Sequence, residues 1–186
     1  MHESEIGVVH GRFQIFHLGH LDYILAAKAK CSFLIVGIAN SDPGMGPPVS
    51  DTHRAAAHAN PMTFYERMMM ITEVLVAQNI PREAFAIVPF PIDRPQLIHY
   101  YAPRGATFFL TIFDEWGEEK KRRLEALRLT TSVLNHGSDP KTHNSTTIRK
   151  RIRDGAPWEG MVPRATAEFL KRHAIDQRIA GMSDTD

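Results

Sequence analysis

The chain has 186 residues, of which 43% are hydrophobic, and this length and composition favour one domain with a full apolar core. The net charge of +1 and the pI near 8.0 exclude a strongly positive surface potential over the whole protein, of the kind that binds nucleic acid. Any anion must therefore be bound by local clusters of Arg, Lys and His. The single cysteine, Cys31, excludes an internal disulfide. The sequence shows neither an apolar stretch of about 20 residues nor a secretory signal. We therefore expect a cytoplasmic protein that binds neither membranes nor nucleic acid.

Short apolar runs of strand length alternate along the chain with segments of helical period. The runs are residues 6–10, 32–39, 84–89, 106–113 and 131–134. Because these runs are apolar throughout, we expect strands that are covered on both faces. The alternation predicts an α/β, Rossmann-like fold with a parallel sheet of about five strands, helices on both faces and a small C-terminal helical appendage. We expect a single domain over residues 1–180 and a frayed tail over residues 181–186.

Four segments show the spacing of helices. The first has apolar residues at helical intervals, namely Leu18, Leu21, Leu25 and Ala29. The second opens with Thr63 and Glu66, which have the spacing of a capping box, and it must end before Pro81. The third is "FDEWGEEKKRRLEALRL" (113–129), whose charged residues suit a solvated face, and the fourth is "PRATAEFLKRH" (163–173).

Two loops are unusually long for such a fold. Residues 40–62 are rich in Gly, Pro, Ser and Asp, and residues 135–145 follow the last predicted strand. Loops of this length in a compact domain are usually functional. Since open parallel sheets bind ligands beyond the carboxyl ends of their strands, we expect both loops and the turn after the first strand to converge on one site.

That turn is "GRFQIFHLGH" (11–20), between the first strand and the first helix. The free N–H groups of the helix would face the cleft, which is a common way to hold an anion. His17 and His20, at i and i+3, lie on one side of the first helical turn, Gly19 leaves room for a ligand, and Arg12 adds a fixed charge. Two readings stay open, a pair of histidines that only caps the helix and a zinc site that lacks convincing third and fourth ligands.

A second polar element, "NSTTIRKRI" (144–152), follows the second long loop. Ser145 and Thr146 lie at the predicted helix N-terminus, and Arg149 follows one turn later. The hydroxyl groups, the backbone N–H groups of the helix N-terminus and the guanidinium would then point toward the same place, where they could bind a phosphate. On its own the pattern also fits a capped surface helix.

Together these elements resemble a known family. "GRFQIFHLGH" resembles the GRFQPFHxGH element, and "NSTTIR" resembles the SxTxIR element, of the nucleotidylyltransferases related to nicotinamide mononucleotide adenylyltransferase. "NPMTFYERMMMI" (60–71) is similar to the NPFTxxERxxMI stretch of the archaeal-type members. The resemblance covers residues 6–80 and 140–172.

The resemblance implies that a nucleoside triphosphate lies over the HxGH turn and that an acceptor oxyanion attacks its α-phosphorus, releasing pyrophosphate. It assigns catalysis to His17, His20 and Arg149. The residues expected to bind nucleotide are Gly11, Arg12, Phe13, Gly19, Ser145 and Thr146. Because such transfer needs mainly positioning and charge neutralisation, Mg²⁺ is expected to arrive on the triphosphate, with no protein ligands of its own. The resemblance leaves open whether the protein forms a homo-oligomer.

The expected acceptor region departs from the family pattern. "PFPIDRPQLIHYYAP" (89–103) has no Trp or Asn where members that bind nicotinamide mononucleotide usually have a polar, Trp-containing segment, and the first long loop is longer than theirs. The residues expected to bind the acceptor are His53, Arg54, Asp93, Arg94 and Lys141. We therefore predict transfer from CTP or ATP to a small phosphate or phosphonate, as in the related cytidylyltransferases that activate phosphonates or polyol phosphates.

Three alternatives are weighed against this prediction. A nicotinamide mononucleotide adenylyltransferase would share every motif except the acceptor segment. A nucleotide-sensing binding protein would be expected to lack one of His17, His20 and Arg149, yet all three are present. A class I aminoacyl-tRNA synthetase fragment would bring a lysine-rich loop that the sequence does not show.

Overall fold

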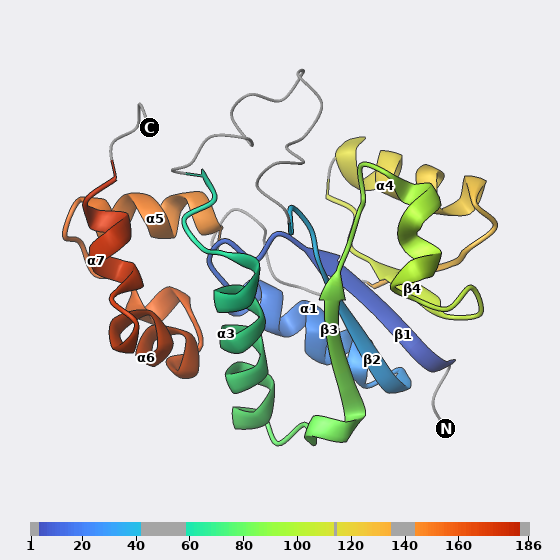
Figure 1. Ribbon diagram of the computed structural model, residues 1–186, viewed down its shortest axis with the longest axis horizontal. Helices are drawn as coiled ribbons and strands as arrows, with labels where there is room; N and C mark the ends of the chain where they lie inside the picture. Colours follow the sequence, from blue (N-terminus) through green and yellow to red (C-terminus); the bar gives the residue numbers. More distant parts are fainter. Residues whose placement is uncertain (1–3, 42–58, 114, 135–143, 183–186) are drawn as a thin grey trace.

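A five-stranded parallel sheet forms the centre of the computed structural model, which describes residues 4–41, 59–113, 115–134 and 144–182. The strand order is β3-β2-β1-β4-β5 (Figure 1). The strands are β1 (Ser4–Gly11), β2 (Cys31–Ile38), β3 (Phe85–Pro89), β4 (Thr107–Leu110) and β5 (Thr130–Val133). The helices are α1 (Leu18–Lys28), α3 (Phe64–Ala77), α4 (Glu115–Ala126), α5 (Ser145–Arg153), α6 (Arg164–Arg172) and α7 (Ile175–Ala180), with 3-10 turns η2 (Arg82–Ala84), η3 (Pro95–Tyr100) and η4 (Glu159–Met161). The predicted Rossmann-like α/β class is confirmed.

Each face of the sheet has its own apolar core, because successive residues of a strand point to opposite sides. Val9 of β1 and Phe109 of β4 pack with α1, α3 and the C-terminal helices. Their neighbours Val8 and Phe108 pack with α4 and η3 on the other face. Helices therefore cover both faces, as the continuous apolar runs predicted (Figure 1).

The boundaries of α3 follow the predicted signals. The Thr63 hydroxyl accepts the N–H of Glu66 at 3.2 Å, and the Glu66 carboxylate accepts the N–H of Thr63 at 2.8 Å. This reciprocal capping box starts the helix, which ends at Ala77, four residues before Pro81.

The C-terminal helices form the predicted appendage and pack on the α1 face of the sheet. α6 lies against α3, and α7 lies against α5 and α6. Buried Phe169 and Ile175 join this appendage to the core, and Arg178 forms a bidentate ion pair with Glu66 at 2.8 and 2.9 Å. The appendage therefore packs against α3 and α5. Within the described ranges, no helix combines the length and apolarity needed to cross a bilayer.

Candidate active site

The first turn of α1 is closed by its two histidines. His17 is the N-cap residue, and its Nδ1 accepts the N–H of His20 at 3.3 Å, while Nδ1 of His20 accepts the N–H of His17 at 3.3 Å. The rings are stacked, with centroids 3.6 Å apart. The capping role left open by the sequence is therefore present. Because Nδ1 accepts in each ring, the proton of a neutral imidazole lies on Nε2.

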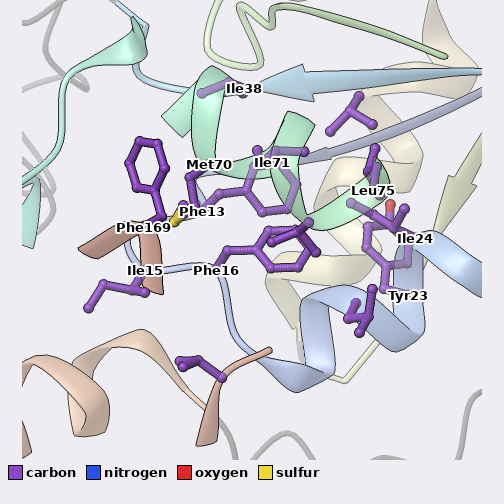
Figure 2. Packing of buried hydrophobic residues seen from close by; sticks show 14 of the residues in the cluster. Phe13, Ile15, Phe16, Tyr23, Ile24, Ile38, Met70, Ile71, Leu75 and Phe169 are labelled. Carbon is purple, nitrogen blue, oxygen red and sulfur yellow. The ribbon is translucent and has the colours of Figure 1, made fainter. Parts of the chain in front are cut away.

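An aromatic layer lies under His20. The Phe13 ring meets His20 edge-on at 4.9 Å between centroids and is 1% exposed, inside the core cluster that Figure 2 shows. A Cβ on Gly11 would lie 2.9 Å from the Phe13 ring, so this close approach requires glycine at position 11. The Phe13 side chain therefore supports His20, and its contact with a nucleotide stays a prediction.

Burial sets the charge of His20. It lowers the pKa of His20 well below the usual value, and the neighbouring charges of His17 and Arg12 act in the same direction. A backbone hydrogen bond at Ile15 opposes them. His20 is therefore neutral near pH 7.

The N-terminus of α5 contacts the same turn, although it lies more than a hundred residues later. The Ser145 hydroxyl donates to the carbonyl of Ile15 at 2.9 Å. Nη1 of Arg149 donates to the carbonyl of Gln14. The HxGH turn and the NSTTIR segment are therefore in direct contact. Most of the two long loops that were expected to converge here, residues 42–58 and 135–143, lies outside the described residues.

Two guanidinium groups are buried near the ends of β1 and β2. Arg67, 1% exposed, donates to four carbonyl oxygens at 2.7 to 3.2 Å, those of Arg12, Ala39, Asn40 and Thr63. Arg149, 4% exposed, also donates to the Thr146 hydroxyl at 3.2 Å. Burial first, and then the charge of Arg12, lowers the pKa of each to about 10, so both stay positive near pH 7. Because these bonds go to carbonyl and hydroxyl oxygens, the two charges are not neutralised by them and favour an anion at this edge.

A protein-family comparison matches residues 8–151 to the model described as cytidylyltransferase-like. The chain belongs to this family. It is a nucleotidyltransferase, as the two motifs predicted.

Among curated relatives of this cytidylyltransferase-like chain, a phosphonoformate cytidylyltransferase of Streptomyces viridochromogenes is 42% identical over 93% of this chain and 94% of its own length. A nicotinamide-nucleotide adenylyltransferase of Halobacterium salinarum is 29% identical over 95% of this chain and 91% of its own. A solved bifunctional NMN adenylyltransferase/ADP ribose pyrophosphatase of Francisella tularensis superposes with a TM-score of 0.68 at 19% identity, which shows the shared fold. The match covers 95% of this chain but only 52% of that structure.

Sequence reasoning missed two residues that hold the turn in place. Arg67 was part of the quoted NPMTFYERMMMI stretch but was not singled out. Gln14, 2% exposed, donates to the carbonyl of Met62 at 2.8 Å and accepts its N–H at 2.9 Å. Arg67 and Gln14 thereby join the HxGH turn to the segment before α3. Both belong to motif stretches, which was the available signal, but their long-range carbonyl partners are visible only in the fold.

The structure describes only two of the five residues that were expected to bind the acceptor. Asp93 and Arg94 are exposed and follow β3, which β2 separates from β1 in the sheet, and their role at the acceptor stays a prediction. His53, Arg54 and Lys141 lie outside the described residues. Gly19 lies in the first turn of α1, beside the capping histidines, where it was expected.

No three His, Cys, Asp or Glu side chains among the described residues lie together as a protein-held metal site would need. The residues of the turn are instead N–H donors and cations, which suit the oxygens of a phosphate.

Proposed function

We propose that the protein transfers CMP from CTP to phosphonoformate or a closely similar small phosphonate, releasing pyrophosphate. The observation that carries the reaction type is the contact between the first turns of α5 and the HxGH turn that leads into α1, beside two buried guanidiniums that bond to carbonyl and hydroxyl oxygens. The relative that is 42% identical over nearly the whole of both chains is named as a phosphonoformate cytidylyltransferase, and this supports the choice of CTP and of the acceptor.

The chemistry needs little covalent help from the protein. An oxygen of the acceptor phosphonate forms a bond to the α-phosphorus of CTP, and the bond from that phosphorus to the β-phosphate oxygen breaks, so pyrophosphate leaves with the electron pair. We assign the Nε2–H groups of His17 and His20 to the phosphate oxygens, where charge builds up during transfer. Arg12 and Arg149, with the N–H groups of α1 and α5, offset the charge of the triphosphate.

The segment after β3 lacks the Trp that members binding nicotinamide mononucleotide usually have there, and this supports a compact acceptor. Phe90, Ile92 and Ile98 of this segment are buried in the core of the α4 face, while Tyr100 and Tyr101 are exposed.

Mg²⁺ fits the site as part of the substrate. The described residues near the turn are donors and cations, so we assign the metal to the triphosphate, where it would offset charge as the complex binds. The remaining expectations belong to the proposal as well, namely a single domain over residues 1–180 and action in the cytoplasm.

A pyrophosphate-release assay tests the proposal. CTP and ATP are each combined with phosphonoformate, glycerol 3-phosphate or nicotinamide mononucleotide, and kcat/KM is compared across the six pairs. We expect CTP with phosphonoformate to exceed every other pair by at least about 100-fold, since loss of matched hydrogen bonds in a polar site costs that much or more. A higher kcat/KM for ATP with nicotinamide mononucleotide would overturn the proposal and favour an adenylyltransferase instead.

A further inference from the structure

His10 is a buried imidazole that the chemistry described so far does not use. It is the residue before Gly11, at the carboxyl end of β1, and it is 9% exposed. Its ring is stacked on Phe90, with centroids 4.5 Å apart and planes 15° from parallel. The sequence makes room for this stack, because a Cβ on Gly37, opposite His10 in β2, would lie 2.5 Å from the Phe90 ring.

Both ring nitrogens of His10 lack a hydrogen-bond partner among the described residues. Buried polar groups are nearly always paired, so such a ring needs an explanation. Burial, with a smaller contribution from the charge of Lys120 on α4, lowers the pKa of His10 to about 3. The ring is therefore neutral and has one N–H donor and one acceptor nitrogen to offer. An apolar ring of similar shape would pack against Phe90 without that cost.

The position of His10 separates it from the nucleotide side. The helices α1 and α5 lie on one face of the sheet, whereas Phe90 and α4 lie on the other (Figure 1). His10 is nevertheless only two residues from Arg12, which opens the HxGH turn. A ligand that touches His10 and also reaches the HxGH turn would therefore lie on the α4 side of β1, and the acceptor is the substrate that we assign to that side.

We propose that His10 binds the acceptor, its ring N–H donating to an anionic oxygen of the phosphonate or carboxylate that does not attack. The proposal rests on the proposed function for the identity of that acceptor. Phe90 holds the ring in its plane, so the N–H is already oriented and little side-chain entropy is lost on binding.

The test replaces His10 by Phe, which keeps the stack on Phe90 and removes both nitrogens, and by Gln, which restores an N–H. We expect His10→Phe to raise the KM for phosphonoformate by about 10-fold to 100-fold while the KM for CTP changes by less than about twofold, as loss of a hydrogen bond to a charged group predicts. His10→Gln should recover part of that loss. His173→Phe, on the exposed end of α6, is the matched control and should change neither constant.

Two readouts do not depend on turnover. His10→Phe should melt at the same temperature as the wild type or higher without ligand, because it buries no unpaired nitrogen, and it should lose the stabilisation that phosphonoformate gives the wild type. In the wild type, the ¹⁵N shifts of the His10 ring, assigned by their absence in His10→Phe, should move when phosphonoformate is added in the presence of a non-hydrolysable CTP analogue. Unmoved ring signals, or an unchanged KM for the acceptor, would overturn the proposal.

The choice of acceptor by the wild-type enzyme tests the proposed function independently of His10. If the wild type uses nicotinamide mononucleotide instead of phosphonoformate, the acceptor has been misassigned, and the same KM comparison with His10→Phe is made for nicotinamide mononucleotide. A raised KM there keeps His10 as an acceptor residue, and an unchanged KM removes it.

Discussion

The α1 side and the α4 side of the strand ends are built differently. On the α1 side, Arg67 and Arg149 are buried and donate to backbone carbonyls, so the turn that would hold the triphosphate is fixed from several directions. On the α4 side, Asp93 and Arg94 are exposed, and buried His10 has unpaired nitrogens. Under the proposed function, this difference corresponds to a firmly held nucleotide site next to an acceptor site whose buried ring nitrogens would be paired by the ligand.

The largest expected effect comes from removing Arg67. Arg67→Met should lower the free energy of unfolding, measured by urea denaturation, by about 3–5 kcal/mol, because several buried carbonyls lose their donor. Arg67→Lys should rescue little, since an ammonium cannot reproduce the planar fork. The control Arg122→Met removes an exposed pairing with Glu119 and should cost less than about 1 kcal/mol. A loss below 1 kcal/mol for Arg67→Met would show that the α1 side is not held in this way.

The next effect is on catalysis at His20. His20→Gln should lower kcat by about 10²–10³-fold with little change in CTP binding, as removal of one donor to developing charge does elsewhere. Gln at this helix position keeps the side-chain bond to the N–H of His17, so the fold should be retained. Circular dichroism checks the fold, and steady-state kinetics with isothermal titration of CTP separates turnover from binding. Equal losses in turnover and binding would reassign His20 to binding alone.

The two sides can also be compared by pH. The pKa of His10 is about 3 in the folded protein and about 6.5 when unfolded, so the unfolded state alone takes up a proton as the pH falls below 6.5. Stability from the neutral ring is therefore present above pH 6.5 and lost below it. Between pH 7 and pH 5 the wild type should lose about 2 kcal/mol more than His10→Phe. Parallel urea titrations at both pH values check this, and identical losses would place His10 in contact with water.

The smallest effect is expected at Arg94, an exposed residue that is predicted to bind the acceptor. Arg94→Ala should raise the KM for phosphonoformate by no more than about fivefold, and the difference should shrink as salt is raised, because an exposed charge is screened. Kinetics at two ionic strengths measure it. A salt-independent loss of 100-fold or more would mean that Arg94 lies inside a closed site and that the two sides are equally well built.

Local patterns predicted most of the α1 side. Continuous apolar runs located the strands, and the Thr63–Glu66 spacing located the start of α3. His17, His20, Ser145 and Arg149 could be identified because each lies in a short contiguous motif. The carbonyl partners of Arg67 and the core position of Phe13 could not, since they depend on contacts between distant segments. His10 was missed because nothing in a strand sequence shows that its neighbour across the sheet is Gly37 and that Phe90 fills the space.

The most direct test of the central claim is a ³¹P NMR spectrum of the wild-type reaction with CTP, Mg²⁺ and phosphonoformate. Joining the phosphonate oxygen to the α-phosphorus creates a mixed anhydride, so we predict two new, mutually coupled doublets that appear together with pyrophosphate and are absent with His20→Gln. A spectrum without coupled doublets, while ATP and nicotinamide mononucleotide yield a dinucleotide under the same conditions, would contradict the account.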